Sequence, residues 1–521
     1  MKELWADKKK RYLILLTSLA FLLITHSYRW MNAMYTHDSL LIVQEDSEWQ
    51  ISLGRIFNPV YVWLRGRIVA PGNVALFASI FLIISVALVI HVLRLKKTIS
   101  IILCCGFMTT FETIVSVNGV FLLSLDLDML ALLFSVLAAC FFMGRESTVR
   151  FIAGVGSIAL VLGLFQSYVE VTIMLICLNL LRELLEGSDA KKSFVKGLRS
   201  VGLLILGGIL YYICLRVVLR STGIAPADTN NGLVQIKSLT FPSVVSLAKE
   251  AWKYSLHYLF SGSLIAHRTI SGWVYRILGF FSLLGIVWIA AKKRLRPAPA
   301  VLIIFLLVIM PLGGNCVYVL NSGLKHLLMT YSFVFFSILA VMVFDLLEID
   351  DTVGCFIRRA IPILCAVLLL NHVLYANQWY IRNDMYSRAG MSFMTRLVAD
   401  MEETEGYEVG RTPVLILGHI DENPASYSEK GYEIANDGMT HHLSISYYQT
   451  YDRYFRFVLG YPVNMVPLSE VAGYLEDPEI QAMPIYPAKG AIQIINGVLV
   501  IRLSGDLRPE ELRLNIATID K

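Results

Sequence analysis

Residues 72–93 read GNVALFASIFLIISVALVIHVL, and the basic residues Arg94, Lys96 and Lys97 follow almost directly. This stretch contains no Asp, Glu, Lys or Arg, and it has the length of about 20 mostly apolar residues that a membrane-spanning helix needs. Basic residues are retained at the cytoplasmic ends of spans. The stretch therefore predicts a transmembrane helix that ends at the cytoplasmic face.

Similar apolar stretches recur from Tyr12 to about Tyr375 and then stop. The 521-residue chain is 56% hydrophobic and 16% charged, against about 25% charged for an ordinary soluble domain. This composition excludes a soluble enzyme and a disordered polymer. It predicts a polytopic α-helical membrane protein with eleven transmembrane helices, near residues 12–30, 72–93, 98–117, 125–143, 151–167, 168–182, 200–219, 273–291, 298–315, 327–345 and 360–376.

The basic clusters set the expected topology. The first span follows the run Lys8–Arg11, and further basic clusters occur at every second loop, which places the N-terminus in the cytoplasm. An odd number of spans then sends the tail outside the cell. The count depends on cutting the apolar run around Gln166 and Ser167 into two short helices, because one uncut helix would leave the tail in the cytoplasm.

Two domains are expected, because the charge balance changes along the chain. Residues 1–375 hold 33 Lys and Arg against 20 Asp and Glu, whereas residues 376–521 hold 12 against 20. The basic excess belongs to the membrane part, so a nucleic-acid partner is excluded. The tail reads as a small extracytoplasmic α/β domain, with a helix near 385–403 and β-branched strands near 412–418, 491–495 and 498–503.

Two other features of the sequence carry structural expectations. All eight cysteines lie in or beside apolar segments and none is in the tail, so we expect buried thiols rather than disulfides or a zinc site. The tail also holds several tyrosines that could stack on sugars, but a tyrosine-rich packing surface is the favoured interpretation. These are Tyr447, Tyr448, Tyr451, Tyr454 and Tyr461.

The outward segments 31–71 and 220–272 are longer than simple connections require. Each contains an amphipathic stretch, at residues 60–64 and 247–252, of the kind that lies in the membrane interface. Long outward loops over a helical bundle can build a site, although they can also merely seal the top of the bundle.

Carboxylates gather on the same predicted outer face. Asp38, Glu45 and Asp46 follow the first span, and Asp126 and Asp128 open the fourth. Ionisable groups near the bilayer are costly and commonly have a function or a partner. Their structural alternatives are a helix cap for Asp38, a solvated loop for Glu45 and Asp46, and helix-dipole contacts for Asp126 and Asp128.

These motifs resemble the bacterial and phage O-antigen glucosyltransferases of the Gtr type, which belong to the GT-C superfamily. The resemblance covers roughly residues 10–375 and rests on a basic-flanked first span followed by His37-Asp38 and Gly54-Arg55. It also covers the span 126–139, which begins with the acidic residue Asp126. A further similarity is the aromatic residue followed by glutamine, Phe165-Gln166, within Leu164–Tyr168. His37 stands where the family tends to carry a second acid, and no motif covers the tail.

The resemblance implies transfer of glucose, or a related hexose, from a polyprenyl-phosphate sugar to a hydroxyl of an extracytoplasmic glycan. A phosphate leaving group needs little acid catalysis, but the reaction needs a base and a cation near the phosphate. Asp38 is the expected base. The expected substrate-binding residues are His37, Glu45, Asp46, Arg55, Asp126, Asp128, Gln166, Lys325 and His326, with Arg55 holding the phosphate and Lys325, His326, Arg268 or His267 as alternatives for that role.

No cofactor is predicted. Asp38 could share a divalent metal with Asp126 or Asp128, but oxygen-rich metal sites usually need more ligands than these. The expected partners are the lipid-linked donor, a surface glycan, the bilayer of a bacterial plasma membrane, and proteins that make and flip the donor.

The alternative functions are a transporter or flippase of a lipid-linked glycan, a glycan polymerase or ligase, and a non-catalytic scaffold. Mid-span positions nearly free of charge disfavour the transporter.

Overall fold

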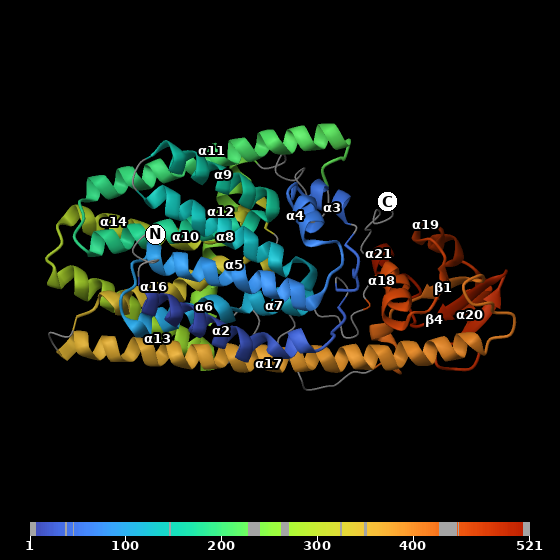
Figure 1. Cartoon of the computed structure of the whole chain (residues 1–521). Coiled ribbons are helices and arrows are strands. Elements are labelled where there is room, and N and C mark those ends of the chain that lie inside the picture. Colours follow the sequence, from blue (N-terminus) through green and yellow to red (C-terminus); the bar gives the residue numbers. More distant parts are fainter. Residues whose placement is uncertain are drawn as a thin grey trace. The chain divides into compact units, whose positions relative to one another are not determined.

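The computed structural model describes residues 7–36, 39–44, 46–144, 147–227, 240–261, 270–323, 326–348, 352–426, 445 and 447–513. Most of these residues are helical (Figure 1). The chain divides into two compact units. Unit 1 comprises Met1–Trp30, Gln44–Asn118 and Ser124–Asn377, and unit 2 comprises Met31–Val43, Gly119–Leu123 and Gln378–Lys521.

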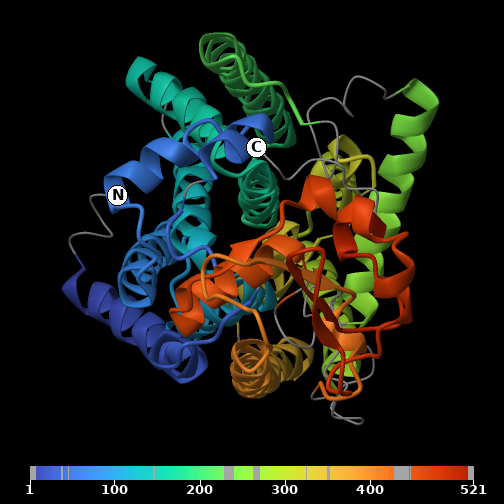
Figure 2. The same ribbon diagram turned by 90° about the vertical axis from the view of Figure 1, so that its right-hand side faces the viewer.

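Unit 1 is a helical bundle, which Figure 2 views nearly along the axes of several helices. The α-helices that begin in this unit are α2 (Lys8–Met31), α3 (Ser47–Ser52), α4 (Asn58–Arg65), α5 (Pro71–Val92), α6 (Thr98–Thr110), α7 (Glu112–Val120), α8 (Leu125–Met143), α9 (Thr148–Leu164), α10 (Val169–Leu185), α11 (Ala190–Thr222), α12 (Phe241–Ser261), α13 (Ile270–Lys292), α14 (Pro297–Gly313), α15 (Val317–Leu320), α16 (Val334–Leu346) and α17 (Thr352–Glu402). Short 3-10 turns lie at Leu122–Ser124 (η1), Gln166–Tyr168 (η2), Leu327–Met329 (η4) and Tyr331–Phe333 (η5).

Seven helices in the described part of the chain are long and apolar enough to cross a membrane: Lys8–Met31, Pro71–Val92, Thr98–Val120, Leu122–Met143, Ala190–Thr222, Gly272–Lys292 and Thr352–Glu402. Shorter apolar helices occur at Thr148–Leu164, Pro297–Gly313 and Tyr331–Leu346. The chain is thus a helical membrane protein. The count of eleven crossings stays a prediction.

Helix α10 forms the centre of the bundle. Most of its side chains are buried, and it packs against α8, α11, α14 and α16. Such all-round burial explains why its sequence is mostly apolar, with Glu170, Asn179 and Arg182 as buried polar exceptions. By contrast, α11 buries few of its 33 residues, which suits a helix that meets lipid.

The helix break predicted around Gln166 and Ser167 is confirmed. Helix α9 ends at Leu164, Phe165 is extended with φ −156° and ψ 110°, and α10 begins at Val169 after the turn η2. The predicted single span 98–117 is instead interrupted, because Phe111 is extended between α6 and α7. The start of the predicted span 327–345 is likewise formed by 3-10 turns.

Helix α12 contains the predicted amphipathic stretch 247–252 and packs on α14. The Trp252 Nε1–H donates to the carbonyl of Val308 at 2.9 Å, and the Ser255 hydroxyl donates to that of Pro311 at 2.8 Å. A proline inside a helix disturbs the backbone hydrogen bonds around it. The Ser255 hydroxyl supplies a donor to the last turn of α14.

Unit 2 contains a four-stranded sheet in the order β2-β1-β4-β3. The strands are β1 (Pro413–Leu417), β2 (Asn464–Met465), β3 (Ile492–Ile495) and β4 (Val498–Arg502). Strand β1 is parallel to β2 and β4, whereas β3 and β4 are antiparallel. Asn496 and Gly497 join β3 to β4 with φ of 52° and 80°, the left-handed pair that a two-residue hairpin requires. The short helices α18 (Tyr448–Arg453), α19 (Leu468–Val471), α20 (Pro478–Ala482) and α21 (Glu510–Arg513), the 3-10 turns η6 (Ile420–Glu422) and η8 (Ala472–Tyr474), and the π-helix η7 (Tyr454–Leu459) complete the unit.

The core of unit 2 lies between the sheet and the last turns of α17. Phe393, Leu397 and Met401 of that helix are buried, as are the tyrosines Tyr448, Tyr451 and Tyr454. The packing interpretation of these three tyrosines is thus confirmed. The predicted tail helix is part of one continuous helix from Thr352 to Glu402.

All eight cysteines are free thiols. The predicted burial is confirmed for Cys104, Cys105, Cys177 and Cys365, which pack as small apolar side chains of the bundle, whereas the other four are partly exposed.

Candidate active site

Asp126, in the first turn of α8, is fully buried, and both of its carboxylate oxygens accept hydrogen bonds. Oδ1 accepts from Arg65 Nη1 at 2.8 Å and from the Leu127 N–H at 3.0 Å, and Oδ2 accepts from the Tyr61 hydroxyl at 2.8 Å. The side chains of Arg65 and Asp126 are 2% and 0% exposed. Separating such a buried pair leaves a charge in an apolar surrounding, so Asp126 and Arg65 hold α4 against α8.

Helix α4 presents one polar and one apolar face. Proline follows its first residue, and Gly66 ends it with φ 94°. Tyr61 and Arg65 are four residues apart and therefore share a face, which meets Asp126, whereas Trp63 and Leu64 are 68% and 69% exposed. Burial and the Asp126 carboxylate raise the pKa of Tyr61 well above its ordinary value, so its phenol remains a hydrogen-bond donor.

Arg55 lies in the turn between α3 and α4. Its guanidinium stacks over the Phe165 ring at 4.4 Å, and its Nη1 donates to Gln50 Oε1 at 3.2 Å. The same oxygen accepts from Asn58 Nδ2 at 3.1 Å. The turn needs Gly54, which has φ 85°, a conformation that glycine adopts at low cost. The Gly54-Arg55 pair thus has a structural reason, because the glycine makes the turn that orients the arginine.

The extended break after α9 brings Gln166 to the same segment. Gln166 Nε2 donates to the carbonyl of Leu53 at 3.0 Å, and the Phe57 N–H donates to that of Gly163 at 2.9 Å. A Cβ at Gly163 would lie 2.3 Å from the Phe57 ring. The segment 53–57 can therefore approach α9 closely only because residue 163 is glycine.

Asp128 differs from Asp126 in having unused hydrogen-bonding capacity. It is 2% exposed, and its Oδ2 has no hydrogen-bond partner within the described chain. It interacts electrostatically with Arg55 and Asp126, and Tyr168 also lies within its electrostatic reach. The Tyr168 hydroxyl, in a side chain only 1% exposed, likewise finds no partner among the residues that the structure describes.

The structure thus brings together four of the predicted site residues. Tyr61 and Arg65 bind Asp126, and Tyr168 lies within electrostatic range of Asp128. These seven residues form what we call the α8 cluster: Arg55, Tyr61, Arg65, Asp126, Asp128, Gln166 and Tyr168. Asp46 is linked to it through Gln50, whose Nε2 donates to Asp46 Oδ2 at 2.5 Å. His326 precedes η4, where its Nδ1 accepts the N–H of Leu328 at 3.1 Å. The other predicted site residues lie outside the described residues: His37, Asp38, Glu45 and Lys325, with the alternatives His267 and Arg268.

Three members of the α8 cluster are not predicted from the sequence. Tyr61 and Arg65 could have been found, because they lie opposite the apolar side chains of the amphipathic stretch 60–64. Tyr168 gives no signal of its own, since buried tyrosines are common in helical bundles. Its importance appears only when the burial and the missing partner of its hydroxyl are known.

No group of three or more His, Cys, Asp and Glu suited to a metal ion occurs in the part of the chain that the structure describes. The Asp126 oxygens are occupied by Arg65, Tyr61 and a backbone N–H. Another acid, Glu170, is also accounted for, because its carboxylate accepts the Val317 N–H at 2.7 Å and the Ser332 hydroxyl at 3.4 Å.

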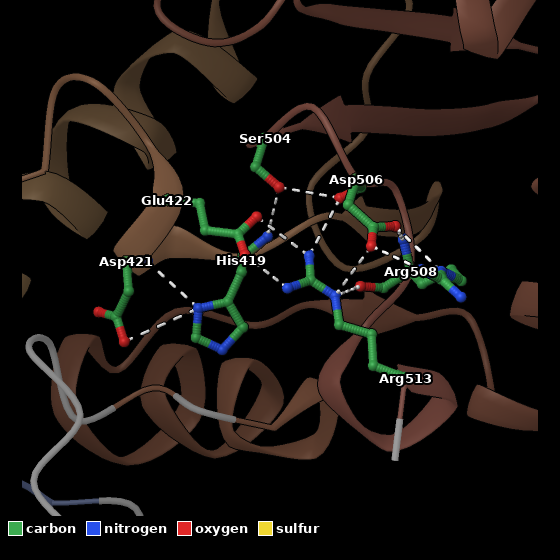
Figure 3. Close-up of polar contacts among 7 residues, drawn as sticks. All are labelled: His419, Asp421, Glu422, Ser504, Asp506, Arg508 and Arg513. Carbon is green, nitrogen blue, oxygen red and sulfur yellow. Dashed lines mark hydrogen bonds and ion pairs between the residues drawn. The ribbon is translucent and has the colours of Figure 1, made fainter. Parts of the chain in front are cut away.

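A second charged cluster lies in unit 2, where the parallel strands β1 and β4 end (Figure 3). We call it the β1–β4 cluster; it consists of His419, Asp421, Glu422, Ser504, Asp506, Arg508 and Arg513. The Ser504 hydroxyl accepts the His419 N–H at 3.0 Å and donates to the Asp506 carbonyl at 2.9 Å. These bonds hold the loop after β4 against the loop after β1.

Ion pairs close the β1–β4 cluster. Arg513 donates to both oxygens of Glu422, at 2.6 and 3.1 Å, and Arg508 donates to both oxygens of Asp506, at 3.1 and 2.9 Å. The hydrogen bonds from Arg508 lower the pKa of Asp506 to about 2, and those from Arg513 lower the pKa of Glu422. The carboxylates and arginines of this cluster bind each other. We therefore interpret it as a clamp, meaning a set of ion pairs that holds the segment after β4 in place.

The fold and the α8 cluster define a helical membrane protein with buried charged and polar side chains near the ends of its helices. The model of the family described as Glucosyl transferase GtrII matches residues 28–344, and the chain belongs to this family. It is therefore a membrane glycosyltransferase of the glucosyltransferase type, which implies a sugar donor and a glycan acceptor. The matched region contains the whole α8 cluster and ends before the strands of unit 2.

No curated protein and no solved structure matches the chain.

Proposed function

We propose that the chain transfers glucose, or a related hexose, from a polyprenyl-phosphate sugar to a hydroxyl of an extracytoplasmic cell-surface glycan, with inversion at the anomeric carbon. The observation that carries this proposal is that Arg55 lies within electrostatic range of the buried Asp128, inside the region that matches a glucosyl transferase family. A cation and an open carboxylate are the groups that a sugar phosphate needs from its site.

Arg55 is the proposed phosphate-binding residue. A planar guanidinium binds two phosphate oxygens at once, and stacking on Phe165 with a bond to Gln50 fixes the orientation of this one. Stabilising the departing phosphate in this way would accelerate cleavage of the sugar–phosphate bond. Lys325 and His326 remain alternatives for this role.

Asp38 is the proposed general base, on the strength of its sequence position. The acceptor hydroxyl would give its proton to the Asp38 carboxylate while its oxygen forms the new bond to C1 of the sugar. The bond from C1 to the phosphate oxygen breaks, and polyprenyl phosphate leaves as an anion with the bonding electron pair. Attack opposite the leaving group inverts the anomeric centre. Glu45 and Asp46 would orient the acceptor.

The α8 cluster would hold the sugar. Asp126 and Arg65 act as positioning residues, since they bind each other and fix α4. Asp128 and Gln166 are proposed substrate-binding residues, with His37 beside the base.

We further propose a multi-pass protein of the bacterial plasma membrane with a cytoplasmic N-terminus and unit 2 outside the cell. Proteins that make and flip the lipid-linked donor would supply it.

The test is the sugar composition of the surface glycan from cells that carry wild-type protein, no protein, Asp38→Asn or Arg55→Gln at equal membrane levels. We expect one hexose side group to vanish in the null and in Asp38→Asn. Arg55→Gln should lower transfer about 100-fold, the loss seen when one group that stabilises transition-state charge is removed.

Arg67→Gln is the matched control, because Arg67 is an exposed arginine of the same outer segment and should keep full transfer. A glycan unchanged in the null would refute the glycosyl-transfer proposal. A glycan altered in the null but normal in Asp38→Asn would remove Asp38 as the base. A change in chain length without loss of a side group would favour a polymerase.

A further inference from the structure

Asp128 and Tyr168 are two deeply buried polar side chains that each leave one atom, Asp128 Oδ2 and the Tyr168 hydroxyl oxygen, without a hydrogen-bond partner among the described residues. The carboxylate is 2% exposed and the tyrosine 1% exposed, and the two residues interact electrostatically without a hydrogen bond between them. A buried polar atom without a partner costs about 1–3 kcal/mol. Such atoms in a native protein therefore require an explanation.

The chemistry of the unpartnered atoms indicates what would satisfy them. Asp128 Oδ2 is an acceptor and the Tyr168 hydroxyl is a donor. A single alcohol group that lies between them can donate to the first and accept from the second. A phosphate cannot, because its oxygens only accept and its charge repels the carboxylate.

Two further buried atoms of the same region extend this pattern. Asn58 Oδ1, an acceptor, and Gln44 Nε2, a donor, also lack partners in the described chain. Asn58 shares Gln50 Oε1 with Arg55, and Gln44 accepts from Arg65. The region therefore offers both acceptors and donors, and the hydroxyl groups of a polyol, which donate as well as accept, can satisfy both.

The surrounding rings hold the Tyr168 hydroxyl in place. The Tyr168 ring lies 5.8 Å from that of Phe165 and 5.8 Å from that of Tyr331. The Ser135 hydroxyl donates to the Tyr168 carbonyl at 2.6 Å, and the Thr172 hydroxyl donates to the Ser135 carbonyl at 2.9 Å. The tyrosine is thus fixed to α8 by its backbone while its phenol points to no protein partner.

We propose that Asp128 and Tyr168 form a sugar-binding subsite that takes one hydroxyl of a neutral hexose ring, which donates to Asp128 and accepts from Tyr168. The subsite rests on the proposed glycosyl-transfer function and specifies which part of the substrate it recognises. The hexose belongs either to the donor or to the acceptor glycan. The phosphate of the donor is recognised separately, by Arg55.

The experiment uses the full chain, purified in detergent, and measures its melting temperature with three probes. These are polyprenyl phosphate glucose, the same polyprenyl phosphate without glucose, and an oligosaccharide released from the surface glycan of cells lacking the protein. Tyr168→Phe and Asp128→Asn are compared with wild type. The melting temperature with polyprenyl phosphate glucose, compared with that for polyprenyl phosphate alone, measures the contribution of contacts to the donor sugar. The rise in melting temperature with the oligosaccharide measures the contribution of contacts to the acceptor.

Tyr331→Phe is the matched control. Tyr331 is also a buried tyrosine of this region, 2% exposed, but its hydroxyl donates to the Met108 carbonyl at 2.8 Å. Its loss should lower the melting temperature without ligand and leave sugar binding intact. Tyr168→Phe should melt at or above the wild-type temperature, because it removes a buried hydroxyl that has no partner.

We expect Tyr168→Phe and Asp128→Asn each to weaken binding of one sugar probe about 3- to 10-fold, the loss that follows when one hydrogen bond is removed. Binding of polyprenyl phosphate should not change. Loss with polyprenyl phosphate glucose assigns the subsite to the donor, and loss with the oligosaccharide assigns it to the acceptor.

Unchanged binding of both sugar probes in Tyr168→Phe would overturn the proposal. A ligand-free melting temperature lowered as in Tyr331→Phe would also overturn it, because the hydroxyl would then serve a structural partner such as a bound water. Failure of the proposed function would look different. The wild-type protein would transfer no glucose, whereas the differences in sugar binding between the variants would persist.

Discussion

The α8 cluster of unit 1 and the β1–β4 cluster of unit 2 use the same kinds of residue in opposite ways. In unit 2, Glu422 and Asp506 each meet an arginine that binds both carboxylate oxygens, near solvent. In unit 1, Asp126 is bound on both oxygens, whereas Asp128, two residues later on the same helix, keeps a buried oxygen without a hydrogen-bond donor.

This difference separates a clamp from a candidate site. Paired surface charges make each other unavailable to a ligand and contribute little to stability. A buried, unsatisfied carboxylate carries a cost that a ligand can remove. A count of charged residues would have rated the two clusters alike, so hydrogen-bond satisfaction is the more useful measure.

The largest effect should follow from removing Asp126. Asp126→Ala leaves the Arg65 guanidinium, 2% exposed, without its carboxylate, which should cost about 3–5 kcal/mol of unfolding free energy. The double variant Asp126→Ala/Arg65→Met should recover much of this loss, because no charge is left buried. Chemical denaturation of the purified protein measures both, and a single variant as stable as wild type would contradict the positioning role of the pair.

A smaller effect is expected in unit 2. Glu422→Gln weakens the bidentate pair with Arg513, but the Glu422 side chain is 45% exposed, so the loss should not exceed about 1 kcal/mol, the range for solvent-exposed pairs. Glycan transfer should be unchanged. A loss comparable to that of Asp126→Ala, or loss of transfer at a normal protein level, would show that the β1–β4 cluster is more than a clamp.

Much of the architecture is readable from the sequence because it follows from local patterns. Apolar length predicts the spans, and β-branched runs place strands β1, β3 and β4. The break around Gln166 is also predictable, since an uncut run could not satisfy the basic loops on both sides. The continuity of α17 is not, because the polar residues after Ala376 read as the end of a span although none of them stops a helix.

The candidate site is only partly readable. The acidic residues at the start of the fourth span draw attention to Asp126 and Asp128, and the Gly54-Arg55 pair draws attention to Arg55. The sequence does not tell the two aspartates apart, because the partner of Asp126 is Arg65, 61 residues away, across a helix contact that no local pattern encodes. It also gives no reason to select Tyr168, whose role depends on the extended backbone at Phe165.

The smallest expected effect concerns the pH dependence of the β1–β4 cluster. Arg508 lowers the pKa of Asp506 to about 2, against about 3.9 for an aspartate in an unfolded chain. A carboxyl with a lowered folded-state pKa adds stability above the unfolded pKa and loses it as the pH falls through the folded value. Arg508→Gln should therefore melt slightly below wild type at pH 6, and the difference should shrink below about pH 4 and vanish near pH 2. Melting curves of both proteins over this range test the prediction, and a difference that persists unchanged at pH 2 would mean that Arg508 acts through packing rather than through the Asp506 charge.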